Sequence, residues 1–275
     1  MVSGIPRLNG GGGGRTVTGW FYDMPPVSRG LLILQLGVTL IVNFGLGKHS
    51  PDLLPFDSKA VIDRFEIWRI FSCYFYLGEF SYPMLLQLYF TAQYGQMYEV
   101  FPFNTGGGGS SADHAWFLMI CAALHILVLG FVLQQKFLGL ALLFSIIYVW
   151  AKRNAEDSVK IWSFSVPSMY FVFGLLALMF FLEQDPMGPI SKMLVKSPSK
   201  HGLVGIAVGH FYFYIVYIHP SYSGMEFIKT PNFLMNIFGI EEPRIPGRPA
   251  ASAATRTVSH RWGSGRVLGS QSRSD

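Results

Sequence analysis

Six long apolar segments, separated by polar stretches, constrain the fold of this chain more than any other feature. Glu99 is the only Asp, Glu, Lys or Arg residue inside them, so their helices would have almost no polar face to turn toward water. In hydrocarbon, helices satisfy their own backbone hydrogen bonds. The sequence therefore predicts an all-α polytopic membrane protein with six spans, at 30–46, 83–101, 115–133, 137–150, 161–182 and 203–218.

Composition supports the membrane assignment and excludes other classes. The chain is 51% hydrophobic and 13% charged, which rules out a disordered chain and argues against a soluble one. The net charge of +5 does not indicate a nucleic-acid partner, because the 21 Lys and Arg residues are spread along the whole chain. Cys73 and Cys121 are predicted to be buried thiols rather than a disulfide or metal pair, and no metal or cofactor site is expected.

An even number of spans places both termini on one side of the membrane. With the termini in the cytosol, 13 of the 21 Lys and Arg residues lie inside and 8 outside, as the positive-inside rule requires. The segment before the first span shows no signal peptide, so that span is expected to act as both signal and anchor. The predicted organisation is a cytosolic segment 1–29, a membrane domain 30–219 with a long loop 47–82, a juxtamembrane segment 220–242, and a disordered cytosolic tail 243–275.

Span 137–150 is short for a membrane helix. Crossing a hydrocarbon core of about 30 Å takes ~20 residues. Either its boundaries extend into the flanking residues or the bilayer thins around it.

The loop after the first span contains an amphipathic, aromatic stretch at 64–71. This stretch is too short and too polar to cross a bilayer, so it is expected to lie in the interface. Trp68 would sit at headgroup depth, and Arg69 would extend its guanidinium toward the phosphates.

The last span carries glycines on one helical face. Gly202, Gly205 and Gly209 recur at i, i+3 and i+7, and Gly205 with Gly209 forms a small-xxx-small motif, which lets another helix approach closely. His210 follows this motif, and His125 lies inside the third span. Both are ionisable groups at membrane depth and so are candidates for function, although the sequence offers no partner for His125.

Several segments, in order and spacing, resemble the Derlins, rhomboid-like proteins of endoplasmic-reticulum-associated degradation. Together they cover about residues 20 to 240. They are RFEIWR at 64–69, LYF at 88–90 with QY at 93–94, YVWA at 148–151 with Asn154, GIAVGH at 205–210 with YF at 212–213, and TPNFL at 230–234.

The resemblance implies a rhomboid-like six-helix bundle in the endoplasmic reticulum membrane that moves misfolded proteins to the cytosol for ubiquitination and degradation. In the family, the Trp-Arg pair and the Gly-xxx-Gly motif are required for function; here they are Trp68 with Arg69 and Gly205 with Gly209. The implied partners are misfolded substrates, a membrane ubiquitin ligase and the lipid bilayer. Homo- or hetero-oligomers are left open.

The motifs of rhomboid proteases are absent. Those enzymes use a serine in Gly-x-Ser-Gly at the start of span four and a histidine three residues before the glycines of the last span. Here span four offers only Ser145, late in the helix, and His201 lies four residues before Gly205. The resemblance therefore implies a pseudoprotease without catalytic residues.

The tail contains a segment at 262–269 similar to the SHP box, by which Derlins dock on the N-domain of valosin-containing protein, an AAA ATPase. Here Arg266 stands one place early and Val267 occupies the usual arginine position, which implies weaker binding. The matching residues are Trp262, Gly263, Gly265, Arg266 and Leu268.

Three other functions are compatible with a polytopic membrane protein of this size. One is a paralogue that imports proteins across a plastid-associated membrane, and the segment before the first span shows no convincing transit peptide for it. Another is an active intramembrane serine protease using Ser145. The third, a small-solute transporter, would need internal repeats and paired charges at the midplane, and the sequence has neither.

Overall fold

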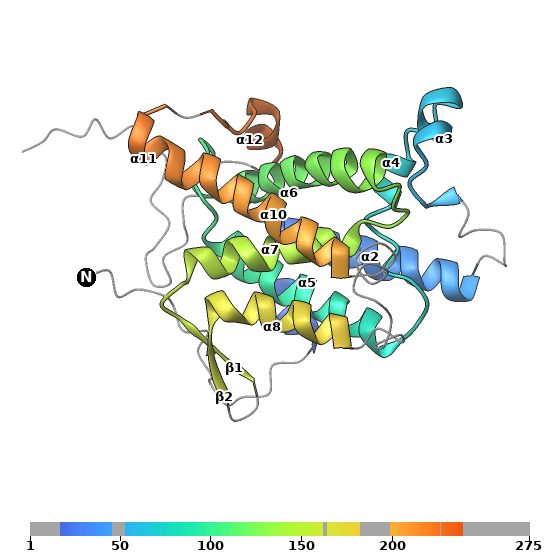
Figure 1. Ribbon diagram of the computed structural model, residues 1–275, viewed down its shortest axis with the longest axis horizontal. Helices are drawn as coiled ribbons and strands as arrows, with labels where there is room; N and C mark the ends of the chain where they lie inside the picture. The colour runs from blue at the N-terminus through green and yellow to red at the C-terminus, as the bar shows by residue number, and fades with distance from the viewer. Residues whose placement is uncertain (1–16, 46–52, 162–163, 182–198, 226, 239–275) are drawn as a thin grey trace, which may run out of the picture. The chain divides into compact units, whose positions relative to one another are not determined.

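The computed structural model of the chain describes residues 17–45, 53–161, 164–181, 199–225 and 227–238 (Figure 1). These residues belong to one compact unit, Met1–Pro243. The predicted tail 243–275, with its SHP-like segment, lies outside the described residues.

The first helices are α1 (Val17–Asp23), α2 (Pro26–Leu40), α3 (Ser58–Asp63), α4 (Arg69–Ser72), α5 (Tyr82–Val100), α6 (Ser111–His125) and α7 (Gly139–Arg153). They are followed by strands β1 (Ser158–Ile161) and β2 (Phe164–Pro167) and by helices α8 (Ser168–Phe181), α10 (Ser199–Phe213), α11 (His219–Ser223) and α12 (Asn232–Phe238).

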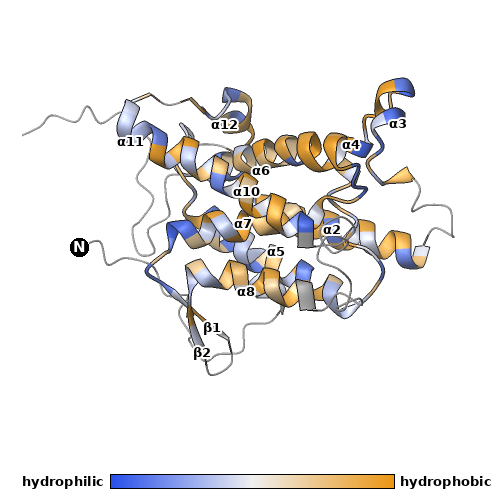
Figure 2. Cartoon of the chain, in the orientation of Figure 1, coloured by the Kyte–Doolittle hydropathy of each residue, from blue (hydrophilic) through white to orange (hydrophobic). Residues whose placement is uncertain are grey.

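Three helices among the described residues are long and apolar enough to cross a membrane: Pro26–Gly45, Ser111–Val132 and Lys200–Ser223. In Figure 2, α6 is coloured mostly in the orange of hydrophobic residues. Each contains a π-helical segment, respectively η1 (Ile41–Gly45), η3 (Ile126–Val132) and η4 (Tyr214–Ile218). The other predicted spans are helical as α5, α7 and α8. The chain is thus a mostly helical, multi-pass membrane protein, and six crossings stay a prediction.

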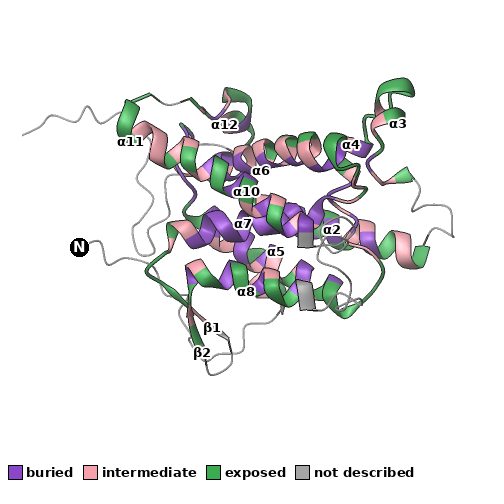
Figure 3. Ribbon diagram, viewed as in Figure 1, coloured by how far each residue is buried: buried purple, intermediate pink, exposed green. Residues whose placement is uncertain are grey.

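Helix α7 forms the centre of the bundle. All its residues from Ala141 to Ala151 are buried, and it packs against α5, α6, α8 and α10 (Figure 3). Its 15 residues rise about 22 Å, less than a hydrocarbon core of about 30 Å. Because protein rather than lipid surrounds this helix, its length need not match the bilayer, which explains why the predicted span 137–150 is so short.

The chain is mostly helical, as predicted, but the fifth apolar segment, predicted as a span from residue 161, starts with a short pair of strands. β1 ends at Ile161 and β2 covers Phe164–Pro167, and the two strands form an antiparallel pair in which Ser158 faces Pro167 and Val159 faces Val166. A residue before proline is biased toward extended backbone, which favours a strand at Val166. The helix of this segment, α8, begins only at Ser168.

Glu99 caps a helix from a distance. Pro25, the residue before α2, gives no side-chain cap, so the first amide groups of α2 need another acceptor. The buried carboxylate of Glu99, near the end of α5, accepts hydrogen bonds from Val27 N at 2.9 Å and Ser28 N at 2.6 Å. It also accepts one from Ser28 Oγ at 2.6 Å. A negative charge at a helix N-terminus is favourable, so this one acid fastens α5 to α2.

Replacing Glu99 tests this cap. Glu99→Gln removes the charge and turns one acceptor oxygen into a donor that faces other donors, so we expect a loss of about 1.5–3 kcal/mol of unfolding free energy. The measurement is the unfolding midpoint of the purified protein in detergent micelles. Glu156→Gln, at an exposed residue, is the control and should leave the midpoint unchanged. Equal midpoints for the two variants would contradict the capping role.

Candidate functional site

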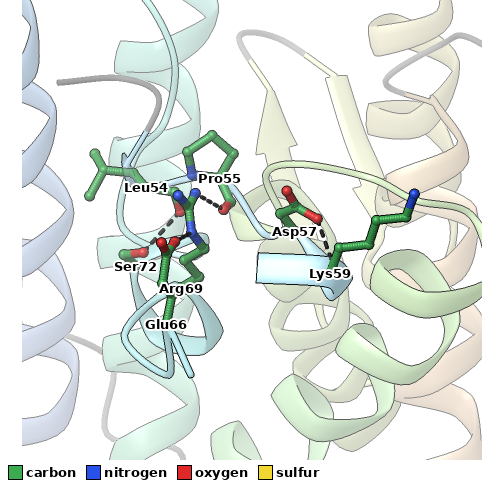
Figure 4. Close-up of polar contacts among 7 residues, drawn as sticks. All are labelled: Leu54, Pro55, Asp57, Lys59, Glu66, Arg69 and Ser72. Carbon is green, nitrogen blue, oxygen red and sulfur yellow. Dashed lines mark hydrogen bonds and ion pairs between the residues drawn. The ribbon is translucent and has the colours of Figure 1, made fainter. Parts of the chain in front are cut away.

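The first loop is organised around Arg69, the first residue of α4. Its guanidinium is buried, forms an ion pair with Glu66, and donates to Pro55 O at 3.0 Å (Figure 4). Ser72 Oγ donates to Leu54 O at 2.9 Å beside it. The expectation that Arg69 extends toward lipid phosphates is therefore wrong. The guanidinium charge is paired inside the loop, where the ion pair with Glu66 and the hydrogen bond to Pro55 O offset the cost of burying it.

The exterior of the same loop is apolar. Phe65, Ile67, Trp68 and Phe71 are each more than half exposed. Phe65 has a φ of +56°, an unusual conformation for a bulky residue, and such residues cluster at functional positions. The arrangement holds Trp68 outward, and in a membrane these side chains are suited to headgroup depth, which stays a prediction.

The far end of the loop, residues 74–80, has no regular secondary structure. Three polar side chains on one face of the α2–η1 helix, at i, i+4 and i+8, bind its backbone. Gln35 Nε2 donates to Tyr74 O at 3.3 Å, Thr39 Oγ1 accepts from Leu77 N at 3.2 Å, and Asn43 Nδ2 donates to Gly78 O at 3.1 Å. Irregular backbone at membrane depth needs such partners. We call Gln35, Thr39 and Asn43 the polar ladder.

The loop also docks on the C-terminal end of the α6–η3 helix. Phe56 N donates to Lys136 O at 2.8 Å, and the ring centroids of Phe56 and Phe131 lie 5.4 Å apart. The Phe56 ring occupies the space that a side chain at Gly130 would need. Arg69, the polar ladder and this contact together fix the position of the loop.

The glycines of α10 pack against α7, as the small-xxx-small motif predicts. A Cβ at Gly205 would collide with the carbonyl oxygen of Ala141 and lie 2.8 Å from Phe144 Cβ, and one at Gly209 would lie 3.2 Å from Ser145 O. His210 is exposed, and its Nδ1 lies 2.8 Å from the Tyr148 hydroxyl, which adds a polar contact between the same two helices.

Ser145 and His125 meet in the core, a pairing that the sequence did not indicate. Ser145 Oγ lies 3.1 Å from His125 Nε2 and donates its proton to Gly205 O at 2.7 Å. A nucleophilic serine must instead give its proton to the histidine. Both residues are completely buried. This geometry suits a structural hydrogen-bond chain between α6, α7 and α10.

A polar cluster that sequence reasoning missed surrounds Asp113 in the first turn of α6. Its buried carboxylate accepts from Gly107 N at 2.9 Å and Gly109 N at 2.7 Å, and from the hydroxyls of Thr105 and Thr230. Thr230 N also donates to Thr105 O at 2.7 Å. We call this the Asp113 cluster. The glycine run at 106–109, directly before a helix with an early acid, was the available signal.

The remaining predicted site lies outside the described residues. It is the tail segment with Trp262, Gly263, Gly265, Arg266 and Leu268. Cys73 and Cys121 are both buried and free, as predicted.

Comparison with known proteins gives one family. The model of the Der1-like family matches residues 24–232. Among curated proteins, "Derlin-1.2" of Zea mays is 29% identical over 220 residues, which cover 79% of this chain and 83% of that protein. "Derlin-1" of Arabidopsis thaliana is 28% identical over 238 residues, covering 85% and 81%. "Derlin-1" of Homo sapiens is 28% identical over 264 residues, covering 92% and 98%.

The glycine contact can be tested by adding one methyl group. Gly205→Ala should push α10 away from α7 and lower the unfolding free energy by about 1–3 kcal/mol, measured as a lower unfolding midpoint in micelles. Gly174→Ala is the matched control, because a Cβ there meets no atom within 4 Å. The interpretation fails if the two alanine variants unfold at the same temperature.

Proposed function

The chain belongs to the Der1-like family, and from this premise we propose that it helps to move misfolded proteins across or out of the endoplasmic reticulum membrane for ubiquitin-proteasome degradation. The observation that carries the proposal is the family match together with the first loop, which buries its charge and exposes four large apolar residues. Each polar backbone group without a partner in hydrocarbon costs several kcal/mol, so a protein that disturbs the bilayer eases the passage of polypeptide.

The first loop supports a role in disturbing the bilayer. Arg69 holds the loop compact from within, and Trp68 with Phe71 would insert at the headgroup level. The polar ladder supplies partners to three backbone groups of the irregular segment 74–80, which lowers the cost of placing that segment deep. In this proposal, Trp68 makes the lipid contact and Arg69 positions it.

The proposed activity is not proteolytic. Ser145 Oγ hydrogen-bonds Gly205 O in the neighbouring helix, and both Ser145 and His125 are fully buried, away from water and from a peptide substrate. We therefore propose that the Ser145–His125 pair is a packing element.

The proposed setting is the endoplasmic reticulum membrane with both termini in the cytosol. The charge bias along the sequence supports it. In the structure, the start of α2 meets the end of α5 at Glu99, and Thr230 meets the start of α6 at Asp113. If α5 and α6 are consecutive crossings, these two contacts lie on the same side of the bilayer, as an even number of spans requires.

The proposed partners are a valosin-containing-protein-type AAA ATPase at the tail, a membrane ubiquitin ligase, and misfolded substrates. Homo- or hetero-oligomers are compatible with this role. An aromatic residue, glycines, a cation and an apolar residue in a short segment suit docking on a folded domain.

Trp68→Ala tests the lipid contact without breaking the bonds of Arg69. In cells that lack the native chain, we expect this variant to lengthen the half-life of a misfolded membrane reporter several-fold in a translation-shutoff chase. Tyr170→Ala removes another exposed aromatic residue, on α8, and should leave the decay normal. Normal reporter decay with Trp68→Ala, at equal protein level, would contradict the proposed role of the loop.

The tail can be tested by co-purification. The ATPase should be recovered with the intact chain and lost from a chain that ends before Ser259. Trp262→Ala should also lose it, whereas Gln271→Ala, outside the matching segment, should retain it. Equal recovery with the intact and shortened chains would remove the tail from the mechanism.

A further inference from the structure

Helix α12 is held at the end of a membrane helix. It follows the candidate span Lys200–Ser223 and packs against α6 (Figure 1). Just before α12, Thr230 joins the Asp113 cluster in the first turn of α6, with its hydroxyl 2.6 Å from that of Thr105. Because α6 begins a candidate span at Ser111, this contact places α12 at the height where the span meets the membrane boundary.

The seven residues of α12 divide into three faces. Leu234 is buried against the protein. Phe233 and Ile237, at i and i+4, share a second face and are 51% and 68% exposed. Asn232 and Asn236, also at i and i+4, form an exposed polar face. At 100° per residue, the apolar exposed face lies between the protein face and the polar face.

The bilayer is the occupant that fits the apolar face. The chain is a multi-pass membrane protein, so the outward side of the α6–η3 helix, which includes the exposed Met119 and Leu127, faces lipid. Phe233 and Ile237 stand at the end of that helix, and Phe227, before the Asp113 cluster contact, is 63% exposed. A helix with one apolar and one polar exposed face at this height is typical of the membrane interface.

A segment with exposed apolar side chains docks at each end of the α6–η3 helix. The first loop docks at its C-terminal end through Phe56 and Phe131, and α12 docks at its start through Asp113. From Asp113 to Phe131 the helix rises about 27 Å, close to the thickness of a hydrocarbon core. Apolar side chains are thus displayed near both boundaries.

We propose that α12 is a second interfacial anchor, which lies in the headgroup region of the leaflet opposite the first loop and inserts Phe233 and Ile237 among the acyl chains. The Asp113 cluster holds the anchor in place, which matters because a helix of seven residues is not stable alone in water. With an anchor at each end, the α6–η3 helix cannot slide along the membrane normal without pulling one apolar group into water. The proposal depends on the membrane alone and not on the proposed role in degradation.

Spin labels on adjacent residues of α12 test the proposal in the full chain, reconstituted in phosphatidylcholine vesicles. Ile237→Cys places the label on the apolar face, and Asn236→Cys is its matched control on the polar face. Cys73 and Cys121 are fully buried, and burial raises the pKa of the Cys73 thiol to about 12, so the unsubstituted chain serves as the unlabelled blank. A label at Leu127→Cys gives the reference for a lipid-facing site.

The readout is the collision rate of each label with oxygen, which concentrates in lipid, and with a water-soluble nickel chelate. We expect oxygen to dominate at Ile237→Cys, as at Leu127→Cys, and nickel to dominate at Asn236→Cys. Nickel dominating at both α12 positions would overturn the proposal, because the apolar face would then lie in water, open to a protein partner. Oxygen dominating at both would also overturn it, because α12 would have no polar face at the surface.

A second variant tests the role of Phe233. Phe233→Asn, in the chain labelled at Ile237→Cys, should shift the label toward nickel, because half of the inserted pair is gone. The label at Leu127→Cys, combined with Phe233→Asn, should not change, which shows that the bundle is still inserted. An unchanged ratio at Ile237→Cys would overturn the assignment of Phe233 as an anchor.

Discussion

Hydrocarbon offers no hydrogen bonds, and the architecture of this chain follows from that constraint. At three places in the described part of the chain where the backbone departs from a continuous helix, polar side chains supply hydrogen-bond partners. Glu99 accepts hydrogen bonds from the first amide groups of α2, and the polar ladder binds the backbone of residues 74–80. Asp113 accepts hydrogen bonds from the glycine turn before α6. The loops next to the membrane can therefore be irregular, which gives the first loop a shape that a plain helix could not provide.

The helices, the buried thiols and the glycine contact between α10 and α7 could be predicted because each depends on a local pattern. Apolar runs indicate helices in lipid, and glycines at i and i+4 indicate close packing. The position of Arg69, the strands after α7 and the pairing of Ser145 with His125 could not. These depend on which residues distant in sequence meet in space, as with Asp113 and Thr230, 117 residues apart. The hydrogen-bond partners of the buried polar residues are thus the part of the structure that local sequence patterns predict least.

Packing and hydrogen bonding are linked at the contact of α7 with α10. Without a side chain at Gly205, α10 comes close enough for Gly205 O to lie 2.7 Å from Ser145 Oγ. The close approach that stabilises the bundle therefore also gives the Ser145 hydroxyl its hydrogen-bond partner. A separation of these helices that freed Ser145 would sacrifice the contact between them.

The polar ladder also has a consequence for how the protein is made. Helix α2 enters the membrane before residues 74–80 have been synthesised, and at about 5–20 residues per second they follow only seconds later. During that interval Gln35, Thr39 and Asn43 have none of their loop partners, and a polar side chain in hydrocarbon is costly. Helix α2 of the nascent chain should therefore remain at the site of insertion, or near water, until residues 74–80 have been made and can bind its polar side chains.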